Sequence, residues 1–253
     1  MMSVMSESLQ HLYQLPLTLA NYHEILSPIY FHVFIRTLLI AGLATLLCLL
    51  ISYPFAYFIA ATRKNTQAIL LLFVIVPFWT SSLIRTYAIM ALLKAKGLIN
   101  TALLSLGIID QPLQMLYTNT ALLIGLVYTL IPFMILPLYT NMARLDKRII
   151  EAARDLGANN RTVFLKIILP MTKPGMLSGS ILVFLPAMTL FYLPALLGGS
   201  KSMLLGNLIQ NQFMGAMNWP LGATSSTVLI AIMLVVVAYY WTHTQSKDRR
   251  DLI

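Results

Sequence analysis

Acidic residues are scarce in this chain of 253 residues. Asp and Glu together number 8 against 17 Lys and Arg, and all charged residues amount to 10% of the sequence, whereas a soluble domain carries about 25%. Hydrophobic residues make up 58%. So little charge with so much apolar sequence excludes an ordinary soluble domain and indicates a membrane protein. The length leaves room for one membrane domain and for no separate globular one.

Cysteine and catalytic groupings are also missing. Cys48 is the single cysteine and falls inside an apolar run, which excludes an intrachain disulfide. No glycine-rich phosphate loop of the G-x-x-x-x-G-K type occurs. The histidines lie in tails or at span ends without metal-ligand spacing, at His11, His23, His32 and His243. We therefore predict no catalytic residue, no metal site and no bound cofactor in this chain.

Long apolar runs are what the sequence has instead. Five of them reach the length of about 20 residues that a bilayer core requires, near residues 33–61, 68–93, 121–142, 176–197 and 223–242. Prolines interrupt them at Pro54, Pro77, Pro132, Pro137, Pro186 and Pro194. Each proline frees a backbone carbonyl that a neighbour or water must satisfy, which fits a bundle around a pathway and equally a structural bundle with tolerated kinks. We predict an all-α, polytopic membrane bundle.

The basic residues predict the orientation of this bundle. Residues 63–64, 144–173 and 247–250 hold 12 of the 17 Lys and Arg residues, and the positive-inside rule places these segments in the cytoplasm. Lys94, Lys96 and Lys201 then lie outside, and Arg36 and Arg85 lie near or within spans. The expected layout is an outer tail over residues 1–31, a transmembrane domain over 32–243 and a cytoplasmic tail over 244–253. The net charge of +9 reflects this topology and contact with membrane lipid, and it does not indicate nucleic-acid binding.

Two further apolar segments are too short to span and belong on the outer side. The first covers residues 98–109, and the second, MLLGNLIQNQF at residues 203–213, has an apolar helical face and a polar one. The second segment fits either a short helix that shapes the outer mouth of a pathway or an interfacial helix resting on lipid.

A charged island interrupts the apolar sequence at residues 151–170, EAARDLGANNRTVFLKIILP. Asp146 is placed to cap a first helix that Gly157 stops in the left-handed conformation. Asn159 or Asn160 is placed to cap a second helix that ends at Pro170. The apolar stripe of the first helix consists of Ile149, Ile150, Ala153 and Leu156. From these features alone, the segment also fits an amphipathic loop on the membrane surface.

The fixed positions of this island resemble the EAA loop of ABC importer permeases. E-A-A is followed after three residues by Gly157 and after nine more by Ile167, Leu169 and Pro170. The resemblance implies a type I importer permease of a bacterial inner membrane, with six spans usual where five are visible here. It implies that the loop, residues 143–175, docks in an ATPase subunit, which binds ATP and Mg. The residues assigned to this coupling are Glu151, Ala152, Ala153, Arg154, Gly157, Ile167, Leu169 and Pro170.

Four further runs are similar to the permeases of bacterial spermidine/putrescine importers. They are VPFWTSSLIRTYA at 76–88, IPFMILPLY at 131–139, FYLPALLGG at 191–199 and NWPLGA at 218–223. The resemblance implies a polyamine path shared with a second permease and fed by a periplasmic polyamine-binding protein. Members of this subgroup often carry a carboxylate where this chain has Ala195.

No acidic residue falls within a predicted span, so we expect aromatic rings and neutral groups to line the path through cation–π contact. For each aromatic residue alone, lipid-facing or core packing is the commoner role. The candidates are Trp79, Arg85, Tyr87, Tyr128, Phe191 and Tyr192. The alternatives are a permease for another small solute of the same class, an ion-coupled secondary transporter and a non-transporting scaffold. Apart from Arg85 and Arg36, this chain lacks the intramembrane ionisable groups that are expected of a secondary transporter.

Overall fold

The computed structural model describes residues 3, 5–6, 14–17, 20–199 and 202–248. The described residues are mainly helical, and they begin with a short antiparallel pair in which Met5 lies opposite Leu17. The elements in order are β1 Met5–Ser6, β2 Gln14–Leu17, α1 Ala20–Ile25, α2 Pro28–Ala61, α3 Lys64–Ile75, η2 Val76–Trp79, α4 Ser82–Leu93, α5 Leu98–Ser105, α6 Asn119–Met142, α7 Lys147–Asp155, α8 Asn160–Val163, η3 Phe164–Ile168, α9 Leu169–Thr189, η4 Pro194–Gly198, α10 Leu205–Gln210, η6 Asn211–Gly215 and α11 Trp219–Asp248.

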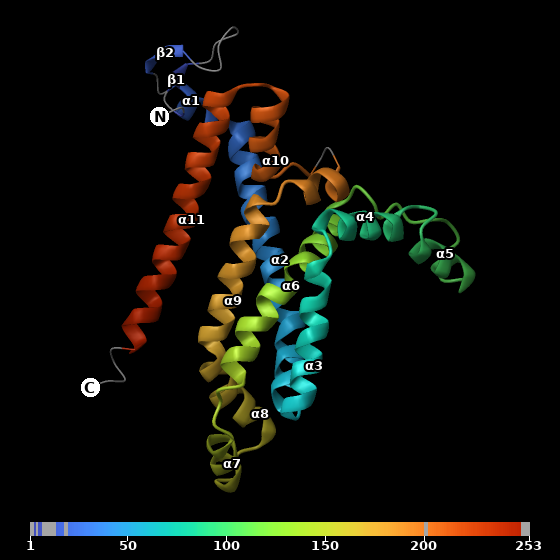
Figure 1. The fold of residues 1–253 in the computed structure, drawn as a ribbon, viewed down its shortest axis with the longest axis vertical. Helices are drawn as coiled ribbons and strands as arrows, with labels where there is room; N and C mark the ends of the chain where they lie inside the picture. The colour runs from blue at the N-terminus through green and yellow to red at the C-terminus, as the bar shows by residue number, and fades with distance from the viewer. Residues whose placement is uncertain (1–2, 4, 7–13, 18–19, 200–201, 249–253) are drawn as a thin grey trace.

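The core is formed by α2, α6 and α9, which pack along the long axis of the molecule (Figure 1). Small α2 residues are fully buried here, at Ala41, Ala44 and Cys48. In membranes, small residues let helix backbones approach closely, and van der Waals packing then holds the helices together. Gly179 of α9 serves the same purpose, because a Cβ at this position would lie 2.7 Å from the Met134 sulfur of α6.

The outer surface of this core is apolar. Leu39 of α2, Phe73 of α3 and Leu234 of α11 are more than half exposed, as expected where hydrocarbon replaces water as the solvent. Five helices of the described chain are long and apolar enough to cross a membrane. The predicted all-α membrane bundle is therefore confirmed. Its boundaries differ from the predicted ones, because α2 begins within the predicted outer tail and α11 continues past residue 243.

The predicted span at residues 68–93 is wrong, because the chain changes direction within it. After α3 a single 3₁₀ turn, η2, carries Pro77, and Thr80 and Ser81 then adopt extended or non-helical backbone angles. Pro77 has no amide hydrogen to donate to a helical hydrogen bond. Its carbonyl accepts a hydrogen bond from the Thr80 hydroxyl at 2.7 Å. Helices α4 and α5 consequently form an arm that lies across the axis of the core (Figure 1). Ser82–Ser105 has the length and hydropathy of a span, and Lys64–Trp79, which lies along the core (Figure 1), is a shorter apolar helix.

The predicted fourth span, 176–197, is displaced toward the N-terminus. Helical structure runs without a break over Asn160–Thr189, so Pro170 does not end a helix as predicted. A π-turn, η3, ends at Ile168, two residues before Pro170, with the Leu169 amide bonded to the Phe164 carbonyl. The wider turn accommodates the proline within the continuous helix. At the other end, Leu190 is extended, and the Phe191 carbonyl accepts a 2.8 Å hydrogen bond from Asn207 beside the 3.3 Å backbone bond from the Ala195 amide.

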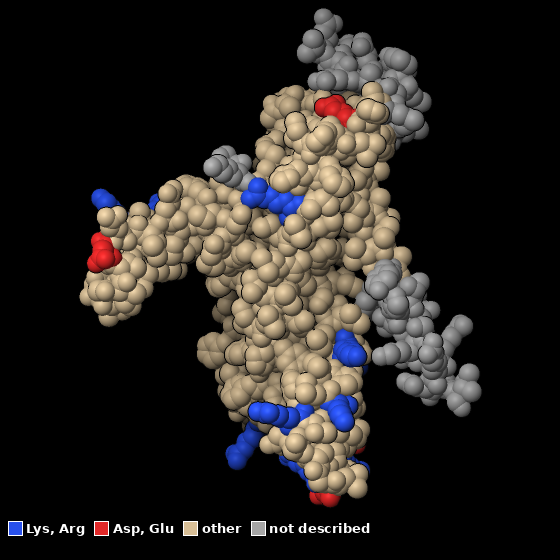
Figure 2. Space-filling view, turned by 180° about the vertical axis from the view of Figure 1, so that it is seen from behind, with Lys and Arg blue, Asp and Glu red and all other residues tan. Residues whose placement is uncertain are grey.

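The two ends of the bundle differ in charge. Helices α7 and α8 lie at one end together with the end of α11, and we call this the loop end (Figure 1). Helix α1, helix α10 and the α4–α5 arm lie at the opposite end, which we call the arm end. Lys and Arg gather at the loop end (Figure 2), which agrees with the predicted orientation. The predicted positions of Lys201, Arg249 and Arg250 lie outside the described residues.

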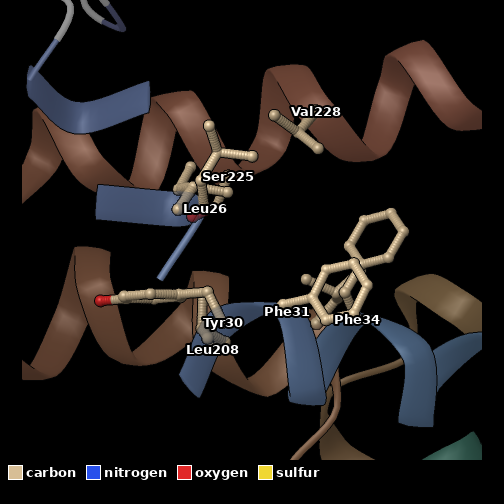
Figure 3. A pocket seen from close by; sticks show the side chains of 9 residues that line it. Leu26, Tyr30, Phe31, Phe34, Leu208, Ser225 and Val228 are labelled. Carbon is tan, nitrogen blue, oxygen red and sulfur yellow. The ribbon is translucent and has the colours of Figure 1, made fainter. Parts of the chain in front are cut away.

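Helix α10 is packed within the arm end of the bundle. Leu205, Gly206, Asn207 and Leu208 are all buried, so the alternative of an interfacial helix resting on lipid is wrong. Together with α1, α2 and α11, this helix encloses an apolar pocket of about 170 Å³ (Figure 3). Tyr30 lies at its edge, where its hydroxyl accepts a hydrogen bond from Gln212 at 3.2 Å.

Candidate functional site

The segment from Asp146 to Asn159, which we call the docking loop, is shaped by local capping interactions. Asp146 Oδ1 accepts from the Arg148 amide at 2.9 Å and begins α7. Gly157 has φ of 83°, and the Ala158 amide reaches back to the Ala153 carbonyl at 3.0 Å, a typical helix stop. Asn159 Oδ1 then accepts from the Thr162 amide at 2.8 Å and begins α8. The predicted cap and stop of α7 are confirmed, and Asn159 rather than Asn160 is the second cap.

The docking loop presents a mixed apolar and charged surface. Glu151, Ala152, Arg154 and Gly157 are exposed, and Ala153 is half-buried. Leu156 is 89% exposed and Ile149 is 43% exposed. The apolar stripe of α7 is therefore not buried against the bundle. A large apolar side chain held out between charged neighbours is typical of a surface that a partner protein covers.

The remaining predicted coupling residues do not lie in the docking loop. Ile167, Leu169 and Pro170 belong to the continuous helix Asn160–Thr189, which we call the coupling rod. Val163 and Ile168 anchor the rod at the loop end and are 2% and 3% exposed. The eight predicted residues therefore form two groups, one that can contact a partner and one that connects this contact to the span.

Three predicted path residues lie at the arm end, where the chain turns from η2 into α4. The Arg85 guanidinium carbon is 5.2 Å from the centre of the Phe78 ring, and Phe78 packs edge to face on Phe133 at 5.2 Å. Trp79 is 80% exposed and Tyr87 is 55% exposed. Arg85 is therefore held at the arm end and not in the middle of a span.

The other three path candidates occupy two further places. Phe191 and Tyr192 form an edge-to-face pair with a centroid distance of 6.1 Å, directly after α9. Tyr128 lies on α6 and lines an apolar groove with Leu47, Ile51 and their neighbours on α2 and α6. None of the other five candidates lines this groove. The structure thus places the candidates along α6 and at the arm end without bringing all six to one cavity.

A polar cavity at the loop end of α6 and α9 escaped the sequence analysis. It measures about 510 Å³, and the Asn141 side-chain oxygen beside it has no hydrogen-bond partner among the described residues. Gly175 makes room for Asn141, since a Cβ there would lie 2.7 Å from the Asn141 Cβ. The sequence does contain a signal, because polar or small residues follow each proline within four positions, Thr140 and Asn141 after Pro137 and Gly175 and Ser178 after Pro174. The lining residues are Leu136, Pro137, Thr140, Asn141, Arg144, Pro174, Gly175 and Ser178.

Comparison with known proteins identifies the class to which this fold and docking loop belong. The chain belongs to the family of the binding-protein-dependent transport system inner membrane component, whose model matches residues 52–250. It is accordingly a multi-pass permease subunit of the inner membrane, a transport component and not an enzyme. A solved bacterial ABC transporter for alginate import has the same fold, with a TM-score of 0.77 at 14% identity over 92% of this chain and 85% of that chain.

Individual relatives of this chain are also found by sequence comparison. The chain is 47% identical over 233 residues to the spermidine/putrescine transport system permease protein PotB of Escherichia coli, covering 92% of this chain and 85% of that protein. It is 44% identical to PotB of Haemophilus influenzae, covering 94% and 83%. The inner membrane ABC transporter permease protein YdcU of Escherichia coli is 30% identical, covering 88% and 75%.

Proposed function

We propose that this chain is the permease subunit of an ATP-driven importer and forms part of the path for a polyamine such as spermidine or putrescine. The observation that carries the proposal is the 47% identity to the spermidine/putrescine permease PotB over 92% of the chain. The matched 233 of 253 residues include the core helices, the arm and the docking loop.

The docking loop is the contact for the ATPase subunits in this proposal. Its exposed Leu156 supplies an apolar anchor, and Glu151 and Arg154 supply charged groups for specific pairing with a cleft. Arg154 is oriented by a 3.4 Å hydrogen bond to Asn160. ATP and Mg are bound by the ATPase and not by this chain, which has no phosphate loop.

The arm end receives the solute from a periplasmic binding protein. One structural neighbour of the same fold, with a TM-score of 0.74, is an alginate ABC transporter in complex with its alginate-bound periplasmic protein. In the proposed complex a second permease subunit lies beside this chain. The α4–α5 arm and α10 give the outer surface its shape.

A polyamine is a polycation, so its path must compensate positive charge. Residues 28–61, 64–79, 119–142, 160–189 and 219–238 contain no Asp or Glu, and an unpaired cation in hydrocarbon is prohibitively costly. This subunit therefore contributes aromatic faces and neutral oxygens, such as the Phe191–Tyr192 pair and the free Asn141 oxygen. Carboxylates come from the partner permease.

The test is uptake by the complex reconstituted with its ATPase, second permease and binding protein. Labelled spermidine, putrescine, sulfate and an amino acid are offered separately. Uptake of the polyamines above the other two supports the proposal, and preference for sulfate or the amino acid overturns it in favour of another solute. The variants Trp79→Ala, Tyr87→Ala and Tyr192→Ala test the aromatic path. Unchanged uptake in all three contradicts the aromatic path while the polyamine proposal stands.

A further inference from the structure

Tyr53 of α2 contacts the coupling rod at the start of its π-turn and again after the turn. The Tyr53 ring packs edge to face on Phe164, with a centroid distance of 5.9 Å. Its hydroxyl lies 3.0 Å from the Thr172 hydroxyl. Phe164 is the first residue of η3, and Thr172 lies in the first turn of α9. One side chain therefore connects α2 to the rod at the first residue of the irregular turn and beyond its end.

The π-turn is what brings these two contacts to one face of the rod. Phe164 and Thr172 are eight positions apart, and at about 100° per residue a regular helix would set them about 80° apart in direction. The π-turn contains one additional residue, so the eight positions advance like about seven. This leaves about 20° between the two side chains. A regular helix over the same residues would present only one of them to Tyr53.

The direction of the hydrogen bond follows from its surroundings. Thr172 is fully buried and donates its single hydroxyl proton to the Leu169 carbonyl at 3.1 Å. Its oxygen therefore accepts from Tyr53, whose hydroxyl is the donor. A partly buried hydroxyl pair of this kind favours one register of the two helices, because the Tyr53 hydroxyl loses its acceptor if the helices slide.

The position of this contact would allow it to transmit movement from one helix to another. The rod is helical from the docking loop to Thr189, so a displacement of the loop moves the rod. Tyr53 is adjacent to Pro54, the one proline inside α2, where the backbone ladder is interrupted and the helix bends most readily. We propose that Tyr53 is a positioning residue that carries movement of the docking loop from the coupling rod to α2. This inference rests on the proposed function, because it assumes that the loop engages an ATPase.

The experiment measures solute taken up per ATP hydrolysed by the reconstituted complex. Tyr53→Phe keeps the ring on Phe164 and removes the hydroxyl, and Thr172→Val removes the acceptor with little change in shape. Each variant should lower the uptake per ATP about twofold to tenfold, the range that corresponds to one net hydrogen bond. The double variant should be no worse than either single one, because both remove the same bond. Copurification of the ATPase should be unchanged.

Tyr139→Phe is the matched control. Tyr139 of α6 donates to Gln67 of α3 at 3.1 Å, so this variant also removes a hydrogen bond from a tyrosine hydroxyl to another helix, but away from the rod. It should leave uptake per ATP unchanged. If Tyr53→Phe lowers only the amount of folded complex, or changes uptake per ATP no more than Tyr139→Phe does, the role of Tyr53 in coupling is refuted. Failure of the wild-type complex to take up a polyamine would instead refute the proposed function.

Discussion

The Arg85 guanidinium lies over the ring of Phe78, with its carbon 5.2 Å from the ring centre. Phe78 belongs to η2 and Arg85 to α4, so the contact spans the corner at which the chain turns from α3 and η2 into the arm. The ring attracts the cation through its quadrupole, and Phe133 of α6 supports the ring from the side. This pair therefore fixes the direction of the arm relative to the core.

Replacing Phe78 by Leu should destabilise the protein by about 0.5–1 kcal/mol, the usual size of a cation–π contact. The measurement is thermal unfolding of the detergent-solubilised permease. Phe73→Leu is the control, because Phe73 is 69% exposed on the outer face of α3. Equal melting temperatures for the two variants would contradict a stabilising role for the Arg85 contact.

Gly157→Val should abolish coupling to the ATPase while the protein still inserts in the membrane. A φ of 83° costs a β-branched residue about 1–3 kcal/mol, so α7 would lose its stop and the docking loop its shape. Uptake and ATPase copurification are measured, also with Glu151→Lys added. Gly107→Val in the arm carries the same backbone strain at φ of 66° and should leave copurification intact. Normal uptake and copurification in the Glu151→Lys, Gly157→Val variant would refute the docking assignment.

Leu156→Ser should weaken ATPase binding by about 1–3 kcal/mol without affecting the stability of the permease itself. The reason is that Leu156 is 89% exposed in the permease and is buried against the ATPase in the proposed complex. The affinity of the purified permease complex for its ATPase is the measured quantity. Leu106→Ser serves as the control, since Leu106 is 71% exposed on the arm. A loss of affinity in both variants alike would argue against a specific anchor.

Gly179→Ala should destabilise the α6–α9 contact by about 1–3 kcal/mol, as overpacking does. The added Cβ would lie 2.7 Å from the Met134 sulfur, and the shorter side chain of Met134→Ala should recover part of the loss. Gly42→Ala meets no atom within 4 Å and should be neutral or stabilising. Thermal unfolding distinguishes the three, and a neutral Gly179→Ala would show that the sulfur moves freely.

Reporter fusions should place the two ends of the bundle on opposite sides of the membrane. Fusions after Lys64, Arg161 and Lys247 should report cytoplasm, and fusions after Lys96 and Lys201 should report the outer side, because the basic residues gather at the loop end. The readout is the activity of a reporter that is active on one side only. A cytoplasmic signal after Lys96 would reverse the assignment of the arm end.

The docking loop could be predicted from the sequence because its shape depends on neighbours in the chain. Asp146 and Gly157 act within one or two turns of α7, and such caps are visible as residue types. The arm could not be predicted in the same way. The hydropathy of residues 68–93 sums the apolar side chains on both sides of Pro77. It contains no information on the direction of the chain, so two helices joined at a sharp turn are predicted as one span.

The end of α9 and the polar cavity depend on contacts between distant residues. Asn207 donates to the Phe191 carbonyl from 16 positions away, and this bond ties α10 to the chain just after α9 in a way that no local pattern records. Gly175 and Asn141 meet across two helices. The candidate path aromatics were chosen by residue type, and only the three-dimensional arrangement separates Tyr128 from Phe191 and Tyr192.

The glycines of α9 also determine which parts of the subunit can move independently. Because Gly175 and Gly179 seat α9 directly on Asn141 and Met134 of α6, a slide between the two helices would drive new side chains into backbone. We therefore expect α6 and α9 to move as one rigid body, and a disulfide between cysteines introduced into the two helices should leave uptake intact. In the proposed complex, the opening for the solute then forms where these helices face the second permease subunit, and not between α6 and α9.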